Sequence, residues 1–154
     1  MQNFDLRVYG LLINDKQQIL LSDECENGRF FTKFPGGGVE YGEGILSALH
    51  REFLEELNLE ISEAKPLSFT DFYTESPFEE NSQLVCFYYL VKCDLSKIKT
   101  FDYQIPFSVE GEKQRWVSIQ DLNENEITFK HDKVASEKLK NWAQKKRGSS
   151  LNLF

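Results

Sequence analysis

The segment from residue 35 to residue 57 constrains the fold of this chain more than any other stretch. Pro35 is followed by three consecutive glycines, a composition that predicts irregular backbone rather than helix or strand. The residues that come next contain no proline and predict a helix over Ile45–Leu57, with glycines at 42 and 44 marking its entry. The sequence therefore predicts a glycine-rich loop that leads directly into a helix.

The predicted helix carries two stripes of side chains. A rotation of about 100° per residue places four bulky apolar residues on a stripe that should face the core: Leu46, Leu49, Phe53 and Leu57. A second stripe beside it is acidic and consists of Glu52, Glu55 and Glu56. Like charges at this spacing cost roughly 0.2–0.5 kcal/mol per exposed pair, and a cation such as Mg²⁺ would turn that repulsion into coordination. Taken alone, a solvated acidic face is the commoner explanation.

The rest of the chain alternates apolar runs with polar turns. Residues 84–92 are apolar on both faces and should form a central strand. Residues 131–145 predict a second helix, and the polar stretches 23–29 and 74–83 are expected to be loops. Further strands are expected at residues 7–13, 18–22, 30–34, 67–73 and 115–119.

No repeat or linker divides the sequence, so residues 1–154 are interpreted as a single domain. Residues 96–112 match no element clearly. The tail from residue 148 onward is expected either to dock on its own domain or a second subunit, or to be flexible. A monomer and a homodimer are both open.

Composition excludes several classes of protein. Hydrophobic residues make up 40% of the chain, which is too many for a disordered protein. No apolar run approaches the roughly 20 residues of a membrane span, and the first residues lack the basic flank and apolar core of an export signal. Three cysteines without a CxxC pair indicate neither a disulfide framework nor a zinc site. We therefore expect a cytoplasmic protein that does not enter the membrane.

The net charge of the chain restricts the classes of ligand that we expect it to bind. The formal net charge is −7, and an acidic protein gains little from the phosphate backbone of long nucleic acid. Small phosphorylated ligands can still bind an acidic protein when metal ions bridge the two. Carboxylates crowd between Glu40 and Glu63, so a small phosphorylated molecule held through metal is the expected partner.

The residues from Gly37 to Leu59 resemble the Nudix box, G-x5-E-x7-R-E-U-x-E-E-x-G-U, where U is a bulky apolar residue. The matching positions are Gly37, Glu43, Arg51, Glu52, Phe53, Glu55, Glu56 and Leu59. The lead-in of residues 34–40 is similar to that of the family as well. Asn58 stands where the family has glycine, and Asn tolerates the left-handed backbone that the end of this helix needs. Phe53 fills a position that is more often aliphatic, which should alter packing rather than chemistry.

The resemblance implies an α+β fold, namely the α/β/α sandwich of the Nudix family with a mixed β-sheet and the loop–helix–loop of the box. It also implies a site for a divalent ion, Mg²⁺ or Mn²⁺. The implied ligands are Glu52, Glu55, Glu56 and the backbone carbonyl of Gly36. Glycine suits that last place because the backbone must come close to metal and phosphate.

The resemblance implies further roles inside the box. Glu56 is the first choice for a ligand beside the attacking water. Arg51 is a candidate for catalysis, although an ion pair with Glu43 that holds the loop against the helix is the favoured role. Glu40 is a weaker candidate that would reach a metal through water.

One more glutamate is expected outside the box, because some relatives that cleave nucleoside triphosphates carry an extra metal-binding Glu before a Trp-bearing strand. Glu110 is the first candidate and Glu112 the second, and the alternative is that both are solvent-exposed loop residues. His50 and His131 have no partner that indicates catalysis.

Aromatic residues in or near loops are candidates for stacking on a nucleobase, although core packing is the commoner role for any one of them. These residues are Phe72, Tyr73, Phe78 and Tyr103.

The function implied by the resemblance is metal-dependent hydrolysis of a phosphoanhydride bond in a nucleoside diphosphate linked to another moiety, foremost a nucleoside triphosphate. ADP-ribose, nucleotide sugars and dinucleoside polyphosphates are the alternative substrates. The alternative class is a non-catalytic module that senses a nucleotide, but degenerate members typically lose the box carboxylates, and Glu52, Glu55 and Glu56 are all present here.

Overall fold

The computed structural model of this protein describes residues 2–100 and 109–147. Tyr103, part of the unassigned stretch 96–112 and the tail from residue 148 lie outside the described residues. The strands are β1 (Asn3–Leu12), β2 (Gln18–Glu26), β3 (Arg29–Lys33), β4 (Gly36–Gly38), β5 (Ile61–Phe69), β6 (Ser82–Cys93) and β7 (Gly111–Ser118). The helices are α1 (Ile45–Leu57), α2 (Lys130–Arg147) and the short 3-10 helix η1 (Leu95–Lys97).

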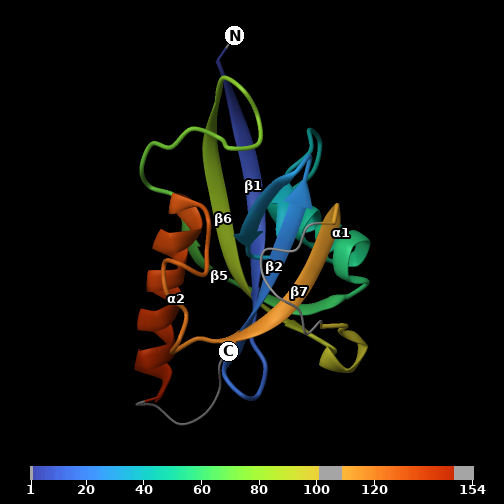
Figure 1. Ribbon diagram of the computed structural model, residues 1–154, viewed down its shortest axis with the longest axis vertical. Coiled ribbons are helices and arrows are strands. Elements are labelled where there is room, and N and C mark those ends of the chain that lie inside the picture. Colours follow the sequence, from blue (N-terminus) through green and yellow to red (C-terminus); the bar gives the residue numbers. More distant parts are fainter. Residues whose placement is uncertain (1, 101–108, 148–154) are drawn as a thin grey trace.

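The strands form two sheets, in the orders β4-β1-β6-β5 and β3-β2-β7. Because β1 pairs in parallel with β6 and antiparallel with β4, the first sheet is mixed. The strand β6 lies between β1 and β5, as its apolar faces predicted. Helices α1 and α2 flank the strands on opposite sides (Figure 1). The expected α+β sandwich of the family is thus confirmed.

Both faces of β1 are buried because a helix covers each of them. Tyr9 and Leu11 belong to the same core cluster as Leu139 of α2. Val8 and Leu12 belong to the other core cluster, which surrounds Phe53 of α1. Successive side chains of a strand point to opposite faces, so one strand contributes to two cores and fixes the helices relative to each other.

Phe53 packs against Gly10 in this arrangement. Any side chain at Gly10 would collide with the Phe53 ring. The aromatic residue in the box is therefore accommodated by the absence of a side chain on β1, and its effect is on packing.

Helix α1 has the predicted bounds, and Asn58 ends it with φ 53°, in the left-handed conformation. The buried face is rotated relative to the predicted stripe, because Ala48, Leu49 and Phe53 are its buried residues. Leu46 is 41% exposed, so its predicted place in the core is wrong. The rotation turns the Glu52 side of the helix inward, toward the glycine-rich segment.

Two loop predictions are wrong. Residues 23–26 continue β2, and the chain turns back into β3 at Asn27 and Gly28, which both have positive φ, as a tight hairpin requires. The segment Gly36–Gly38 is the strand β4 rather than irregular backbone. A side chain on Gly36 would overlap the backbone of β1, so the glycine allows a close pairing that local propensity does not predict.

Other element ends differ from the predictions by a few residues. The largest difference is at β5, which begins at Ile61 instead of residue 67 and ends at Phe69. It lies at the edge of the sheet, where Pro66 falls at a register irregularity and needs no donor. No helix within the described residues is long and apolar enough to cross a membrane.

Candidate active site

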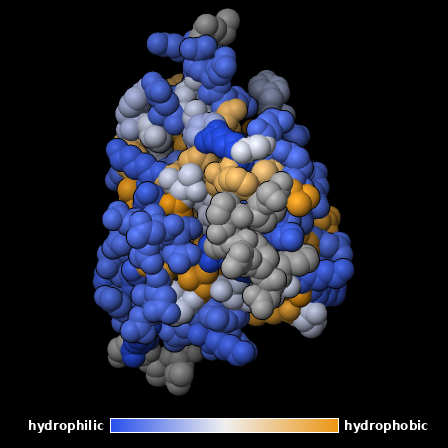
Figure 2. All heavy atoms as spheres, in the orientation of Figure 1, coloured by the Kyte–Doolittle hydropathy of each residue, from blue (hydrophilic) through white to orange (hydrophobic). Residues whose placement is uncertain are grey.

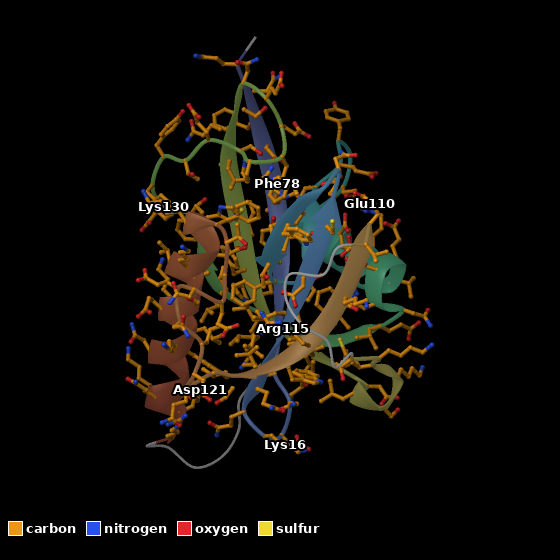
Figure 3. The ribbon with its side chains drawn as sticks, in the orientation of Figure 1. Lys16, Phe78, Glu110, Arg115, Asp121 and Lys130 are labelled. Carbon is orange, nitrogen blue, oxygen red and sulfur yellow. The ribbon has the colours of Figure 1, made fainter. Side chains whose placement is uncertain are left out.

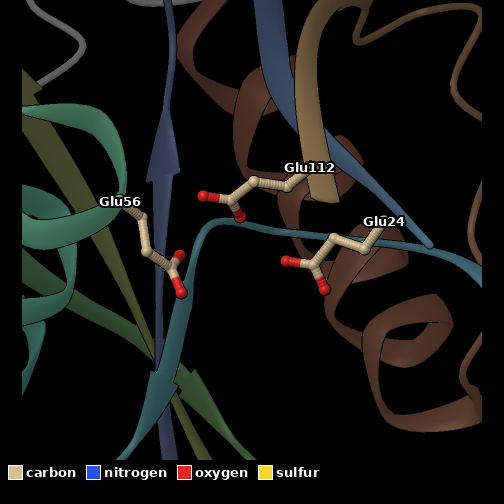
Figure 4. A group of neighbouring side chains, drawn as sticks. All are labelled: Glu24, Glu56 and Glu112. Atoms are coloured by element: carbon tan, nitrogen blue, oxygen red, sulfur yellow. The ribbon is translucent and has the colours of Figure 1, made fainter. Parts of the chain in front are cut away.

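Three glutamates from distant parts of the chain converge beside the glycine-rich strand. Glu24 lies on β2, Glu56 on α1 and Glu112 on β7, and one carboxylate oxygen of each lies within 4.8 Å of the others. Their carboxylates point toward a common space (Figure 4). We call this set the carboxylate cluster. Glu24 and Glu112 are direct partners in the β2–β7 register, a position in which like charges destabilise a sheet.

The carboxylate cluster is half-buried, and its electrostatics reflect this. Burial raises the pKa of Glu56 well above the ordinary carboxyl range, and the charges of Glu112 and Glu52 act in the same direction. Burial also raises the pKa of Glu112, with a further contribution from its hydrogen bond with Glu24. Negative charge is therefore held here at a cost that a bound cation would remove.

One cation already contacts the cluster. The ammonium of Lys33 lies 3.3 Å from Oε1 of Glu24 and donates a 3.0 Å hydrogen bond to the carbonyl of Gly36. Its side chain is only 4% exposed. This carbonyl is the backbone ligand that the box resemblance implies, so Lys33 joins an expected metal ligand to a member of the cluster.

The pair Glu43–Arg51 clamps the loop to helix α1. Nε of Arg51 donates to Oε1 of Glu43 at 2.5 Å, and Nη2 donates to Oε2 at 3.0 Å. Nη2 also donates to the carbonyl of Gly38 at 3.0 Å. The hydrogen bond from Arg51 is the largest cause that lowers the pKa of Glu43 to about 2. Glu40 lies farther out, with its carboxylate 3.9 Å from Arg51 and largely exposed.

The acids of the box face different ways. Glu52 is 13% exposed and accepts a 3.0 Å hydrogen bond from Nη1 of Arg51. Its carboxylate packs on Gly37, where an added Cβ would lie 2.6 Å from it. Glu55 is 60% exposed and also faces Arg51, at 3.3 Å. Glu52 and Glu56 therefore line the cleft beside the glycines, whereas Glu55 points away from it.

The cleft has a volume of about 400 Å³. Four glutamates line it together with the glycines of β4, namely Glu24, Glu52, Glu56 and Glu112. It is also lined by Arg7, Phe31 and Phe78. The face in Figure 2 is mostly hydrophilic, with apolar residues scattered over it. The cleft thus combines carboxylates with aromatic rings and a guanidinium.

Arg7 is held in place by two aromatic residues, Phe78 and Tyr9. Its guanidinium carbon lies 3.9 Å from the centroid of the Phe78 ring, and Nε donates to the hydroxyl of Tyr9 at 2.8 Å. Phe78 belongs to the loop after β5, which is held by a hydrogen bond of 2.5 Å from Ser76 to the buried Asp5. The guanidinium and the ring therefore form a stacked pair that the loop keeps over the cleft.

The other predicted residues lie elsewhere. Glu110 lies beside the start of β7 (Figure 3) and lines the cleft outside the carboxylate cluster. It accepts a 3.1 Å hydrogen bond from the backbone of Gly28. Tyr73 is 65% exposed, and Phe72 lies beside Lys130. His131 is buried, which lowers its pKa to about 4, and His50 lies exposed on α1.

Glu24 was not predicted as a site residue. The polar composition of residues 23–29 predicted a loop. The direction in which an acidic side chain points cannot be predicted from the sequence when it lies in a loop. The signal that could have identified it is the alternation of Leu20, Ser22 and Glu24 on one face of a longer strand. The second candidate outside the box, Glu112, is the one that the structure brings to Glu56.

The donors present suit a hard divalent ion. Carboxylate oxygens from three elements meet at one point, and the glycine carbonyl of residue 36 faces the same cleft. Mg²⁺ and Mn²⁺ prefer such oxygen ligands, whereas no cysteine or histidine lies in the cluster to favour a softer ion.

Comparisons with known proteins agree with the fold and the box. The chain is 41% identical over 49 residues to an RNA pyrophosphohydrolase of Ruthia magnifica subsp. Calyptogena magnifica, a stretch that covers 32% of this chain and 26% of that relative. The match thus spans about a quarter of the relative's length.

Solved structures match over nearly the whole chain. The ORF135 protein of E. coli has a TM-score of 0.67 at 17% identity, covering 97% of this chain and 96% of its own. A MutT from a study of Aliivibrio salmonicida and Vibrio cholerae has a TM-score of 0.60 at 26% identity, covering 89% and 96%. A MutT protein of Methanosarcina mazei has a TM-score of 0.66 at 17% identity, covering 95% and 97%. The model of the NUDIX domain family matches residues 3–138, and the chain therefore belongs to the Nudix family.

Proposed function

We propose that this protein is a hydrolase that depends on a divalent metal and cleaves a phosphoanhydride bond in a nucleoside diphosphate linked to another moiety, foremost a nucleoside triphosphate. The observation that carries the proposal is the convergence of Glu24, Glu56 and Glu112 beside the glycine-rich strand of the Nudix box. Folding alone gives no reason to place three acids together in a half-buried cleft.

The ion would be Mg²⁺ or Mn²⁺, held by the carboxylate cluster with Glu52 and the Gly36 carbonyl at its side. When bound, such an ion neutralises phosphate charge and lowers the pKa of a bound water. Glu55, which the resemblance implies as a ligand, faces Arg51 and would need to change its rotamer to take part.

The protein's own groups would orient the reaction and move its proton. A carboxylate oxygen of Glu112 or Glu24 that is not bound to metal is placed to accept a proton from the attacking water. The hydrogen bond between these two side chains allows the proton to be shared once it is accepted. Arg51 keeps the Gly38 carbonyl and Glu52 in place from outside the cleft.

The aromatic lining of the cleft supports a nucleotide rather than inorganic pyrophosphate as substrate. Phe78 and Phe31 offer ring faces on which a nucleobase can stack. Arg7 offers a fixed guanidinium that can donate to a phosphate or to base acceptors. A small nucleotide fits these dimensions, and the net charge of −7 opposes binding of long nucleic acid. Free Cys25, Cys86 and Cys93 support a reducing, cytoplasmic setting.

A substrate panel tests the proposal. Nucleoside triphosphates, ADP-ribose, nucleotide sugars and dinucleoside polyphosphates are incubated with Mg²⁺, with Mn²⁺ or with EDTA, and products are resolved by chromatography. We expect metal-dependent cleavage that is abolished in Glu56→Gln. Glu137→Gln, the same change on the exposed face of α2, should retain full activity. Turnover in EDTA, or full activity of Glu56→Gln, contradicts the proposal, and binding without turnover across the panel would favour a sensing module.

A further inference from the structure

Lys33 is a buried lysine, and its place needs an explanation. It is the only lysine that is buried among residues 2–100 and 109–147, at 3% exposure. A buried ammonium is costly unless it is paired and hydrogen-bonded. A lysine at the end of an ordinary hairpin strand could instead extend into solvent at little cost. Its burial here therefore points to a partner that holds it.

Two of the partners of Lys33 line the cleft, and the other two belong to the core. The ammonium donates to the carbonyl of Gly36 at 3.0 Å and lies 3.4 Å from that of Phe34. It lies 3.3 Å from a carboxylate oxygen of Glu24 and 5.4 Å from the centroid of the Tyr9 ring. Two of these groups, the Gly36 carbonyl and the Glu24 carboxylate, are ligands of the proposed metal site. The ammonium thus lies where ligands for a cation converge.

Charges in the cluster balance in a simple way. When ionised, the three carboxylates carry three negative charges, of which Lys33 offsets one. A divalent ion carries two positive charges, so it can supply the charge that Lys33 otherwise supplies. Without any divalent ion, Lys33 is the positive charge that contacts the cluster within the described residues, since Arg7 pairs with Asp5 and Arg51 with Glu43.

We propose that Lys33 is a positioning residue that serves as the counter-cation of the carboxylate cluster while no divalent ion is bound, and that a divalent ion takes over this role when it binds. The inference rests on the metal site of the proposed function. Two consequences follow from it. The ammonium holds Glu24 and the Gly36 carbonyl at their places in the empty site. It also repels an incoming divalent ion, and thereby weakens metal binding to the free protein.

Metal binding without substrate tests the second consequence. Lys33→Met removes the charge and keeps the length of the side chain. Lys16→Met, in an exposed turn far from Glu110 (Figure 3), makes the same change of net charge and serves as the control. Free Mn²⁺ is followed by electron paramagnetic resonance at pH 8.5 in the absence of nucleotide. We expect Lys33→Met to bind Mn²⁺ about tenfold more tightly than wild type, and Lys16→Met to match wild type.

Thermal unfolding tests the first consequence. In EDTA, Lys33→Met should melt at a lower temperature than Lys16→Met. Saturating Mg²⁺ should then raise the melting temperature of Lys33→Met more than that of wild type. Equal shifts in the two proteins would show that Lys33 contributes packing alone.

The outcomes separate this inference from the proposed function. Mn²⁺ affinity of Lys33→Met that is equal to or weaker than wild type overturns the role of Lys33 and leaves the metal site intact. A wild-type protein that binds no Mn²⁺ contradicts both. If Lys33→Met does not fold, Lys33→Gln replaces it, because the amide retains a donor toward Gly36 and lacks the charge.

Discussion

Glu24 and Glu112 face each other as direct partners across the β2–β7 ladder, and both carboxylates turn toward Glu56 on α1. Directly opposed like charges destabilise a sheet, so this pairing costs stability in the metal-free protein. Locally unfavourable arrangements of this kind are expected at functional sites, where activity requires the residues. The pair therefore links the β2–β7 register to the proposed metal site.

Replacing one member of this pair should raise the stability of the metal-free protein and lower its hydrolytic activity. Glu112→Gln removes the opposed charge and leaves an amide that can donate to Glu24. In EDTA the variant should be more stable than wild type by roughly 0.5–1 kcal/mol, measured by urea unfolding. Its hydrolytic activity in Mg²⁺ should fall about 10- to 100-fold. Unchanged activity with unchanged stability would mean that Glu112 takes no part in the cluster.

A side chain at Gly37 should displace Glu52, because the carboxylate of Glu52 packs directly on this glycine. An alanine methyl there would lie 2.6 Å from the carboxyl carbon of Glu52. Gly37→Ala should therefore fold and displace Glu52, with a loss of Mn²⁺ affinity and of kcat. The control is Gly44→Ala, whose new methyl would meet only the Ser47 hydroxyl, at 3.5 Å. Equal behaviour of the two variants would count against a role for the Gly37–Glu52 contact.

The clamp of Arg51 depends on its forked donors. Arg51→Lys keeps the charge but cannot reach Glu43, Gly38 and Glu52 together. We expect kcat to fall about tenfold through misplaced ligands, with a smaller change in KM. Circular dichroism should show a retained fold. A variant that keeps the kcat of wild type would show that the loop stays in position without the hydrogen bonds of the Arg51 guanidinium.

Asp132 should make stability depend on pH. It is fully buried, and burial raises its pKa to about 7, while the hydroxyl of Tyr88 donates to it at 2.7 Å. Because the folded-state pKa lies above the ordinary value of 3.8, the protonated form favours folding. That contribution is fully present below about pH 4 and is lost as the pH rises through 7.

Asp132→Asn isolates this effect, because the amide stays neutral and can accept from Tyr88. The free energy of unfolding of each protein is measured with urea at pH 4.5 and pH 8. Relative to wild type, the variant should be more stable at pH 8 than at pH 4.5, by on the order of 2–4 kcal/mol. His131 lies 3.7 Å from Oδ1 of Asp132, and burial lowers its pKa to about 4, so it is mostly neutral in the folded protein at both pH values. A difference that stays constant with pH would mean that Asp132 remains charged in the fold.

The sequence was sufficient to predict α1 and its end. A periodic segment without proline predicted its bounds. Its end at Asn58 was predicted because Asn tolerates a positive φ. The central position of β6 followed from a run that is apolar on both faces. These features depend on local pattern, which a single sequence carries.

Features set by pairing between distant segments could not be predicted in this way. Residues 36–38 form a strand only because β1 accepts backbone without side chains beside it. Glu24 became a site residue only because β2 extends and pairs with β7 in a register that turns it toward Glu56. Glu110 and Glu112 are two residues apart in sequence, and the beginning of β7 at Gly111 decides which one lies inside the sheet.

A crystal structure with Mn²⁺ and a non-hydrolysable nucleotide tests the central claim most directly, because anomalous scattering locates the ion. The account predicts a Mn²⁺ peak within coordination distance of oxygens from Glu56 and from Glu24 or Glu112, with the nucleotide extending toward Arg7 and Phe78. An ion and nucleotide bound elsewhere, with these carboxylates free, would contradict it.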